Sequence, residues 1–137
     1  MLRYLLDTNI CIYVIKLRVI KLRPASLLER FNENAAQMGI SAITLAELLH
    51  GAEKSSQPRR SLAVVEDFCS RLDVLSYGAK AAQHYGLIRA SLERRGLPIG
   101  VNDLHIAAQA RSEGLTLVSN NLREFERVDG LLLDNWV

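Results

Sequence analysis

The sequence predicts an α/β domain in three layers, with helices on both faces of a mostly parallel sheet of about five strands. Short apolar segments alternate with longer helical ones along the 137 residues, and this alternation is typical of repeated βα units. The length suits one domain, which we expect to span residues 1–137. With 49% apolar and 23% charged residues, the chain has enough apolar material for a core.

The predicted strands are short apolar segments that end at polar residues or turns. Because helical segments connect them, we expect neighbouring strands to run parallel. In such sheets, binding sites form beyond the carboxyl ends of the strands. The predicted strands are Arg3–Leu6, Met38–Ser41, Val74–Leu75, Leu115–Val118 and Leu131–Leu133.

Capping signals delimit the predicted helices. Pro24 favours the first turn of one helix, Ser41 can cap another, and Gly96 and Gly114 each end one. The first strand, the Thr-Asn pair that follows Asp7 and the apolar run Ile10–Ile15 are interpreted as a strand, a turn and a helix. The remaining predicted helices are Ala25–Asn34, Ala42–Lys54, Ser61–Arg71, Ala79–Arg95 and Asp103–Glu113.

A tandem pentapeptide, Val-Ile-Lys-Leu-Arg, occupies residues 14–18 and 19–23. Two copies of five residues cannot build a repeat architecture, so we interpret them as a local duplication that lengthens one connection.

Composition excludes several classes of protein. Cys11 and Cys69 are too few and too far apart for a disulfide framework or a zinc site. No apolar stretch approaches the roughly 20 residues that cross a bilayer, and Asp7 interrupts the first apolar run, unlike a secretory signal. We therefore expect a cytoplasmic protein without a membrane partner. The net charge of +2 and the excess of arginine over lysine fit phosphate binding and genomic bias equally well.

Three acids occupy positions that suit a cleft. Asp7 directly follows the first predicted strand, where it can cap a helix or bind a ligand. Glu47 lies in a helix that is apolar nearly all round, so we expect that helix to be largely buried and Glu47 to face a cleft. Asp103 is expected at the head of its helix, as a cap that can also turn one oxygen toward a cleft.

A polar cluster, Ser119-Asn120-Asn121, follows another predicted strand, where it forms either a turn or a ligand group. Several carboxylates cannot share one site while ionised unless cations neutralise them. Oxygen ligands without paired histidine or cysteine indicate Mg²⁺ or Mn²⁺. Such sites activate water and stabilise displacement at phosphorus, so the pattern favours phosphodiester chemistry.

Four motifs stand in a fixed order, and they comprise residues 5–9 (Leu-Leu-Asp-Thr-Asn), 41–48 (Ser-Ala-Ile-Thr-Leu-Ala-Glu-Leu), 102–108 (Asn-Asp-Leu-His-Ile-Ala-Ala) and 118–125 (Val-Ser-Asn-Asn-Leu-Arg-Glu-Phe). Together they resemble the PIN-domain family over nearly the whole chain, and within it the VapC toxins of bacterial toxin–antitoxin pairs. The resemblance implies a PIN-like fold and a metal-dependent endoribonuclease that uses Mg²⁺ or Mn²⁺. It also implies an RNA substrate, often tRNA, a neutralising VapB-type antitoxin, and a homodimer that can enter a larger toxin–antitoxin assembly.

The resemblance also assigns site residues. Asp7, Glu47 and Asp103 match the acids that hold the metal, and Asp103 or Glu47 would orient the attacking water. Asn121 falls where many relatives carry a fourth acid, so this chain departs from the fully acidic pattern and offers less charge to a second metal. The neighbouring polar positions, which would steady a ligand or the scissile phosphate, are Thr8, Asn9, Ser119 and Asn120. The candidates for binding RNA phosphates are Arg89, Arg94, Arg95 and Arg123.

Three alternatives remain open. An acid after the first strand also suggests a haloacid-dehalogenase-type phosphatase, but that family needs a second acid where Asn9 stands, and no lysine follows Lys80. A PIN fold that binds RNA or protein without cutting is the second alternative. The third is a housekeeping PIN nuclease.

The histidines and the tryptophan are expected outside the site. His50, His84 and His105 fall on three different predicted helices, so we expect surface or packing roles for them. Trp136 is expected to be a packing anchor, because no aromatic cluster accompanies it in the sequence.

Overall fold

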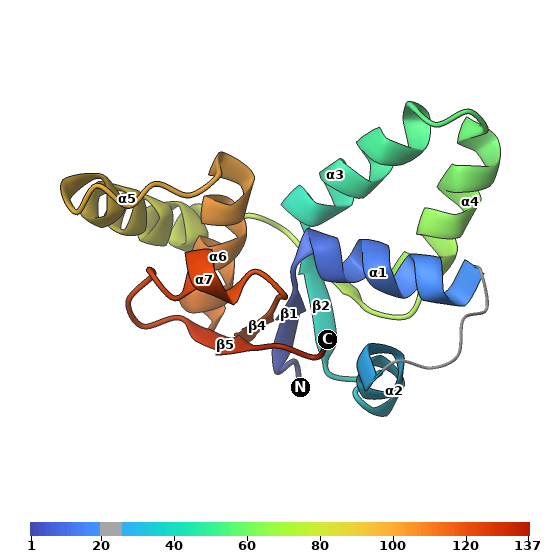
Figure 1. Cartoon of the computed structure of the whole chain (residues 1–137), viewed down its shortest axis with the longest axis horizontal. Helices are drawn as coiled ribbons and strands as arrows, with labels where there is room; N and C mark the ends of the chain where they lie inside the picture. The colour runs from blue at the N-terminus through green and yellow to red at the C-terminus, as the bar shows by residue number, and fades with distance from the viewer. Residues whose placement is uncertain (20–25) are drawn as a thin grey trace.

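One parallel sheet forms the middle of the structure, a computed structural model that describes residues 1–19 and 26–137 (Figure 1). Its strand order is β3-β2-β1-β4-β5, and each of the four neighbouring pairs is parallel. The predicted helix start at Pro24 and most of the second pentapeptide lie outside the described residues. The strands are β1 (Tyr4–Leu6), β2 (Met38–Ser41), β3 (Asp73–Leu75), β4 (Thr116–Val118) and β5 (Leu132–Asp134).

Helices cover both faces of this sheet and confirm the three-layer prediction. One apolar cluster packs helices α1, α2, α3 and α4 against one face of the sheet. A second cluster packs α5, α6 and α7 against the other face. The helices are α1 (Thr8–Val19), α2 (Ser26–Glu33), α3 (Ala42–Glu53), α4 (Pro58–Cys69), α5 (Ala79–Arg94), α6 (Val101–Glu113) and α7 (Leu122–Phe125).

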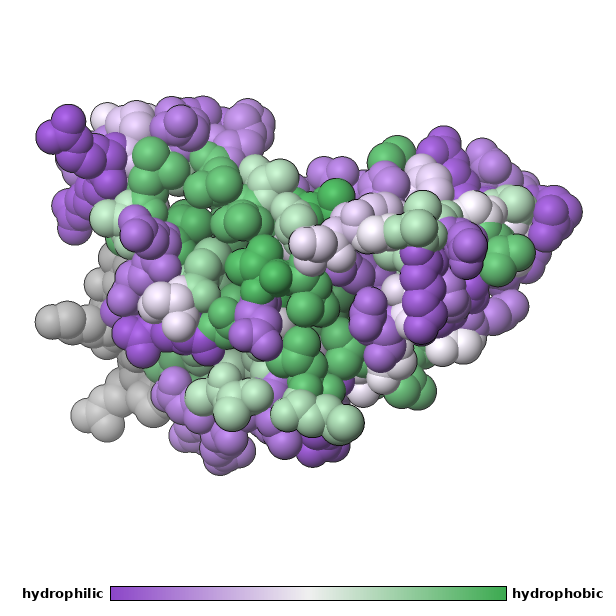
Figure 2. All heavy atoms as spheres, turned by 180° about the vertical axis from the view of Figure 1, so that it is seen from behind, coloured by the Kyte–Doolittle hydropathy of each residue, from purple (hydrophilic) through white to green (hydrophobic). Residues whose placement is uncertain are grey.

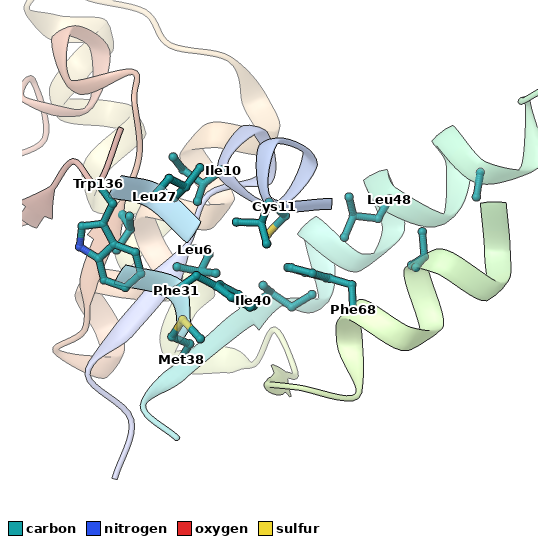
Figure 3. Packing of buried hydrophobic residues seen from close by; sticks show 14 residues of the cluster. Leu6, Ile10, Cys11, Leu27, Phe31, Met38, Ile40, Leu48, Phe68 and Trp136 are labelled. Carbon is teal, nitrogen blue, oxygen red and sulfur yellow. The ribbon is translucent and has the colours of Figure 1, made fainter. Parts of the chain in front are cut away.

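The central strand β1 shows how the sequence builds both layers. Successive side chains of a strand point to opposite faces. Leu5 accordingly packs with α5 and α6, whereas Leu6 packs with the opposite layer, and both are fully buried. Figure 3 shows the cluster around Leu6, with Ile40 and Phe68 from β2 and α4. Each such leucine contributes about 1.5–3 kcal/mol to folding.

Several helix boundaries differ from the prediction. Helix α1 begins at Thr8, directly after the first strand, where a turn was expected. Helix α4 begins at Pro58, because proline suits the first helical position and lacks only an N–H that the helix would leave unpaired. Helix α7 was not predicted, since its four residues are too few for a periodic pattern.

The prediction that the helix carrying Glu47 is largely buried was wrong. Only Thr44, Leu48 and Ala52 of α3 are buried, and Leu49 is 38% exposed. The composition of α3 is apolar on every side, but the described chain covers only one of its faces. Figure 2 shows apolar side chains gathered on the side of the molecule that α3 and α4 form. An exposed apolar surface of this kind is typical of a protein that binds a partner.

Other predictions about single residues agree with the structure. Cys11 and Cys69 are free thiols, and Trp136 is 2% exposed with its ring edge-on to Tyr4. Within the described ranges 1–19 and 26–137, none of the helices combines the length and apolar character needed to span a bilayer.

Candidate active site

The central strands β1 and β4 place two polar side chains beside each other. Leu6 pairs with Val118 in the register, so the next residues, Asp7 and Ser119, leave the sheet together. The Asp7 amide donates a hydrogen bond to the Val118 carbonyl over 2.9 Å. The Ser119 hydroxyl then donates to Asp7 Oδ2 over 2.9 Å. Parallel pairing therefore orients the first acid.

The Asp7 carboxylate is fixed at both oxygens. Oδ1 accepts the Thr8 amide hydrogen over 2.8 Å, Oδ2 accepts the Ser119 hydroxyl, and the residue is only 2% exposed. Burial raises the pKa of Asp7 above its ordinary value, and the negative charge of Glu47 adds to the rise, against the two hydrogen bonds. An oriented and poorly solvated carboxylate is ready to bind a cation.

Helix α3 brings the second acid to the same place. The Thr8 hydroxyl donates to Glu47 Oε1 over 2.7 Å. Its oxygen also lies 3.0 Å from Thr44 Oγ1, whose hydroxyl can donate in return. Thr8 thus contacts Asp7 through its amide and Glu47 through its side chain. The Ser41 side chain caps α3 by accepting from the Ile43 amide, so the cap predicted there is correct.

Asp103 lies in the first turn of α6, whose cap is Gly100, so the prediction that Asp103 heads the helix was wrong by two residues. Burial raises the pKa of Asp103 to about 6, and the negative charges of Asp7, Glu124 and Glu47 contribute to the rise in that order. These repulsions show that the three predicted acids share one electrostatic environment.

The sequence analysis missed Glu124. This residue of α7 is a larger cause of the raised Asp103 pKa than Glu47 is, which places its charge near the acids. The available signal was its spacing, because a residue three positions after Asn121 shares a helical face with it. Because α7 was not predicted, this spacing could not be recognised as helical. Glu124 therefore adds a negative charge to the surroundings of Asp103.

Asn121 takes part in the network through its backbone. Its amide donates to Ser119 Oγ over 2.9 Å, and the Ser119 hydroxyl donates onward to Asp7. Asn9 and Asn120 are exposed side chains that line a pocket of about 310 Å³. The side-chain roles of these three asparagines remain predictions.

The arginine candidates have different surroundings, and their binding of RNA phosphates remains a prediction. Arg123 precedes Glu124 on α7 and is exposed. Arg89 donates to the Tyr85 hydroxyl over 2.6 Å. Figure 1 shows that α5, which ends at Arg94, lies on the opposite side of the sheet from α1 and α3. Arg95 instead holds the Arg127 carbonyl, over 2.7 Å.

The histidines take the surface and packing roles expected of them. His50 is exposed, and His84 accepts a hydrogen bond from Arg111 over 2.9 Å. His105 lies 2.7 Å from the Tyr77 hydroxyl and stacks on Tyr85, with ring centroids 4.2 Å apart.

A groove of about 560 Å³ opens beside the acids, between α1, α3 and α4. Glu47 lies in its wall, and Lys16 and Arg60 contribute basic groups. The groove is mainly apolar, and its apolar residues are Ile12, Ile15, Leu48, Ala52, Val64 and Val65.

Known proteins share this sequence and fold. The PIN domain profile matches residues 4–131. The chain is 61% identical to "Ribonuclease VapC2" of Haemophilus influenzae over 137 residues, covering 100% of both chains. It is 57% identical over 136 residues to the "tRNA(fMet)-specific endonuclease VapC" of Shigella flexneri, covering 99% of both. The crystal structure of DNA-bound VapBC from Salmonella typhimurium matches with a TM-score of 0.93, at 53% identity, over 100% of both chains.

Proposed function

The chain belongs to the PIN domain family, among its VapC ribonucleases, and from this premise we propose that it is a metal-dependent endoribonuclease and the toxin of a toxin–antitoxin pair. The observation that carries the proposal is the link between Asp7, at the carboxyl end of β1, and Glu47 through Thr8. Burial raises the pKa of Asp103 to about 6, and the negative charges of Asp7, Glu124 and Glu47 add to the rise.

The residues of this site fit a hydrated divalent cation. In the described part of the chain, no three histidine, cysteine, aspartate or glutamate side chains already lie close enough to hold a metal directly. Mg²⁺ keeps several of its waters and binds through one or two carboxylates, which suits acids that repel one another without touching. Asp7, Glu47 and Asp103 would hold the ion, directly or through water. When bound, it would polarise a phosphate and acidify water.

A soft metal does not fit this site. The Cys11 thiol is affected by the charges of Asp7 and Glu47. Burial raises the pKa of this thiol well above its ordinary value, so Cys11 stays protonated within the core. The donors at the site are oxygens, as Mg²⁺ and Mn²⁺ prefer.

The protein's own groups prepare the hydrolysis of a phosphodiester. Thr8 and Ser119 hold Asp7 in one orientation, so its charge need not reorganise during the reaction. Glu47 is fixed by the Thr8 hydroxyl through Oε1, which leaves Oε2 to orient a water. Asp103 is the other acid that would orient this water.

The substrate class follows from the relatives. One of them is a tRNA(fMet)-specific endonuclease by name, so we propose tRNA as the substrate and the cytoplasm as the site of action. A non-cutting module and a housekeeping nuclease remain as alternatives. The oriented acids favour a cutting enzyme over the first, and the relatives favour a toxin over the second.

The experiment that tests this function is cleavage of purified tRNA by the purified protein in Mg²⁺ or Mn²⁺. We expect discrete fragments with either ion and none when the ion is chelated, with activity returning when it is added back. Cleavage that survives chelation would contradict a metal-dependent site. Intact tRNA, rRNA and mRNA in both ions would instead support the non-cutting module.

We assign the groove between α1, α3 and α4 to the antitoxin. Its apolar residues suit the apolar face of a short peptide helix or strand, and Glu47 in its wall attracts a basic side chain of that peptide. A peptide seated there covers Glu47 and excludes RNA from the acids. The homodimer and the larger assembly stay predictions.

Replacing Val64, which is half-buried in this groove, with glutamate should raise the antitoxin concentration for half-inhibition about tenfold. The reason is that one buried apolar side chain is worth about 1.5–3 kcal/mol and 1.4 kcal/mol is tenfold in affinity. Titration of each variant's own cleavage rate measures the effect. Val74→Glu, at an exposed position of β3, is the matched control, and equal inhibition of both variants would move the antitoxin elsewhere.

A further inference from the structure

Helix α1 exposes one continuous stripe of side chains. Asn9, Ile12, Tyr13 and Lys16 are all exposed and follow the i, i+3, i+4, i+7 spacing of a single helical face. With Asn120 they line the pocket of about 310 Å³. Tyr13 is 47% exposed, which is unusual for a ring that could have been buried.

This pocket begins at the acids. Asn9 lies two residues after Asp7, and Asn120 directly follows Ser119, whose hydroxyl donates to Asp7. Along the helix axis Tyr13 lies about 6 Å beyond Asn9, and Lys16 about 10 Å beyond it. A nucleic-acid strand held at the acids therefore reaches Tyr13 and Lys16 with its next nucleotides.

Tyr13 and Lys16 have no structural task within the described part of the chain. Neither side chain makes a hydrogen bond, ion pair or ring contact with residues 1–19 or 26–137. Within the described residues, Lys16 therefore presents its charge to a pocket whose other polar groups are the Tyr13 hydroxyl and the amides of Asn9 and Asn120. Exposed aromatic rings stack on nucleobases, lysine binds phosphate as a point charge, and asparagine can both donate and accept hydrogen bonds.

We propose that the exposed face of α1 is the track for the RNA strand that leaves the scissile phosphate, with one base stacked on Tyr13 and a phosphate bound by Lys16. This inference rests on the proposed function and specifies how the substrate is held. It requires an unpaired stretch of RNA, because only unstacked bases can lie on a side-chain ring. Tyr13 and Lys16 would thus bind substrate, whereas the acids act on it.

A peptide is the competing occupant, since the apolar groove shares Ile12 and Lys16 with this pocket. The pocket at Tyr13 differs from the groove in the two amides of Asn9 and Asn120, and Glu47 lines the groove but not this pocket. It also adjoins the pair Asp7–Ser119. Both features favour RNA here and leave the peptide to the groove.

The test measures tRNA binding in an Asp7→Asn background, where substrate stays uncut, together with cleavage kinetics in the otherwise unchanged enzyme. Tyr13→Ala should weaken binding about tenfold and raise KM by a similar factor with little change in kcat, and Tyr13→Phe should restore both. Lys16→Ala should make the slope of log affinity against log salt concentration shallower by about 0.7, and Lys16→Arg should restore it. Lys80→Ala, an exposed lysine of α5, should leave the slope unchanged.

The outcomes separate this inference from the proposed function. If the unmodified enzyme cuts tRNA and the Tyr13 and Lys16 variants bind and cut it equally well, the inference is overturned and the nuclease stands. Variants that handle tRNA normally but escape the antitoxin also overturn it, in favour of a peptide on α1. If no RNA is cut, yet both variants still weaken tRNA binding as stated, the track stands and the nuclease is wrong.

Discussion

Replacing Asp7 with asparagine should lower RNA cleavage at least a thousandfold while leaving the fold intact. Asparagine keeps the size of the side chain and an oxygen for the Thr8 amide, but it removes a negative charge from the proposed cation site. A thousandfold loss corresponds to about 4 kcal/mol of transition-state stabilisation, which is reasonable for an oriented group that acts on the reaction directly. Initial rates of tRNA cleavage at saturating Mg²⁺ measure the effect.

Folding of this variant should not suffer, because burial already disfavours the charged form and raises the pKa of Asp7. A neutral amide in the same place avoids that cost. Circular dichroism and a thermal melt in chelator are the control. Ser119→Ala is the matched variant, since it keeps the Asp7 charge but removes one of its two side-chain hydrogen bonds. We expect it to lose only about tenfold, and an equal loss in both variants would mean that orientation matters and charge does not.

Asp103→Asn should make the metal-free protein more stable at pH 7 and should abolish most cleavage. Burial, with the negative charges of Asp7, Glu124 and Glu47, raises the pKa of Asp103 from 3.8 to about 6. Ionisation of Asp103 therefore costs more free energy in the folded state than in the unfolded state. A shift of about two units corresponds to roughly 3 kcal/mol, which we reduce to about 1–2 kcal/mol because the side chain is partly exposed.

The sign of the pH dependence follows from this raised pKa. The contribution of Asp103 to the free energy of unfolding is fully present below pH 3.8 and is lost as the pH rises through about 6. The stability gained by Asp103→Asn should therefore vanish near pH 4 and reach its full size above pH 7. Melts in chelator at several pH values test this, with an expected gain of roughly 3–8 °C at pH 7.5. A difference that does not change with pH would show that Asp103 is not destabilised by its charge.

Glu124→Gln supplies the matched control for Asp103. Removing this neighbouring charge should lower the Asp103 pKa toward its ordinary value. The change of melting temperature with pH should then occur at a lower pH. Mg²⁺ should raise the melting temperature of the unmodified protein and have little effect on Asp103→Asn, because an ion stabilises only the state that binds it. Equal stabilisation of both proteins would remove Asp103 from the ion site.

The sequence predicted most of the fold because local signals and the global topology agree. Apolar β1 and β4 each end at a polar residue, and parallel pairing brings Asp7 and Ser119 together at one edge. The features that the sequence could not predict depended on tertiary packing or on elements too short to show a periodic pattern. The exposure of Leu49 on α3 depends on which elements cover that helix, and nothing in its own composition specifies this.

The acids show the same division. Asp7, Glu47 and Asp103 were predicted from their positions and from the family resemblance, and the structure brings their charges together. Glu124 was missed because α7 has four residues and no periodic pattern to reveal it. The position of Asp103 was misjudged because Gly100, which lacks a capping side chain, starts α6 two residues earlier than expected.

The hydrogen bond from Ser119 to Asp7 joins residues 112 positions apart, and this separation has a consequence during protein synthesis. At about 5–20 residues per second, the ribosome needs roughly 5–20 s after Asp7 to make Ser119. Until β4 emerges and pairs with β1, the carboxylate at Asp7 has neither its buried setting nor its second donor. We therefore expect a chain that stops before β4 to lack an ordered Asp7 and to leave RNA uncut. Because β1 pairs with the late strand β4, we expect the active site to form only when translation of the chain is nearly complete.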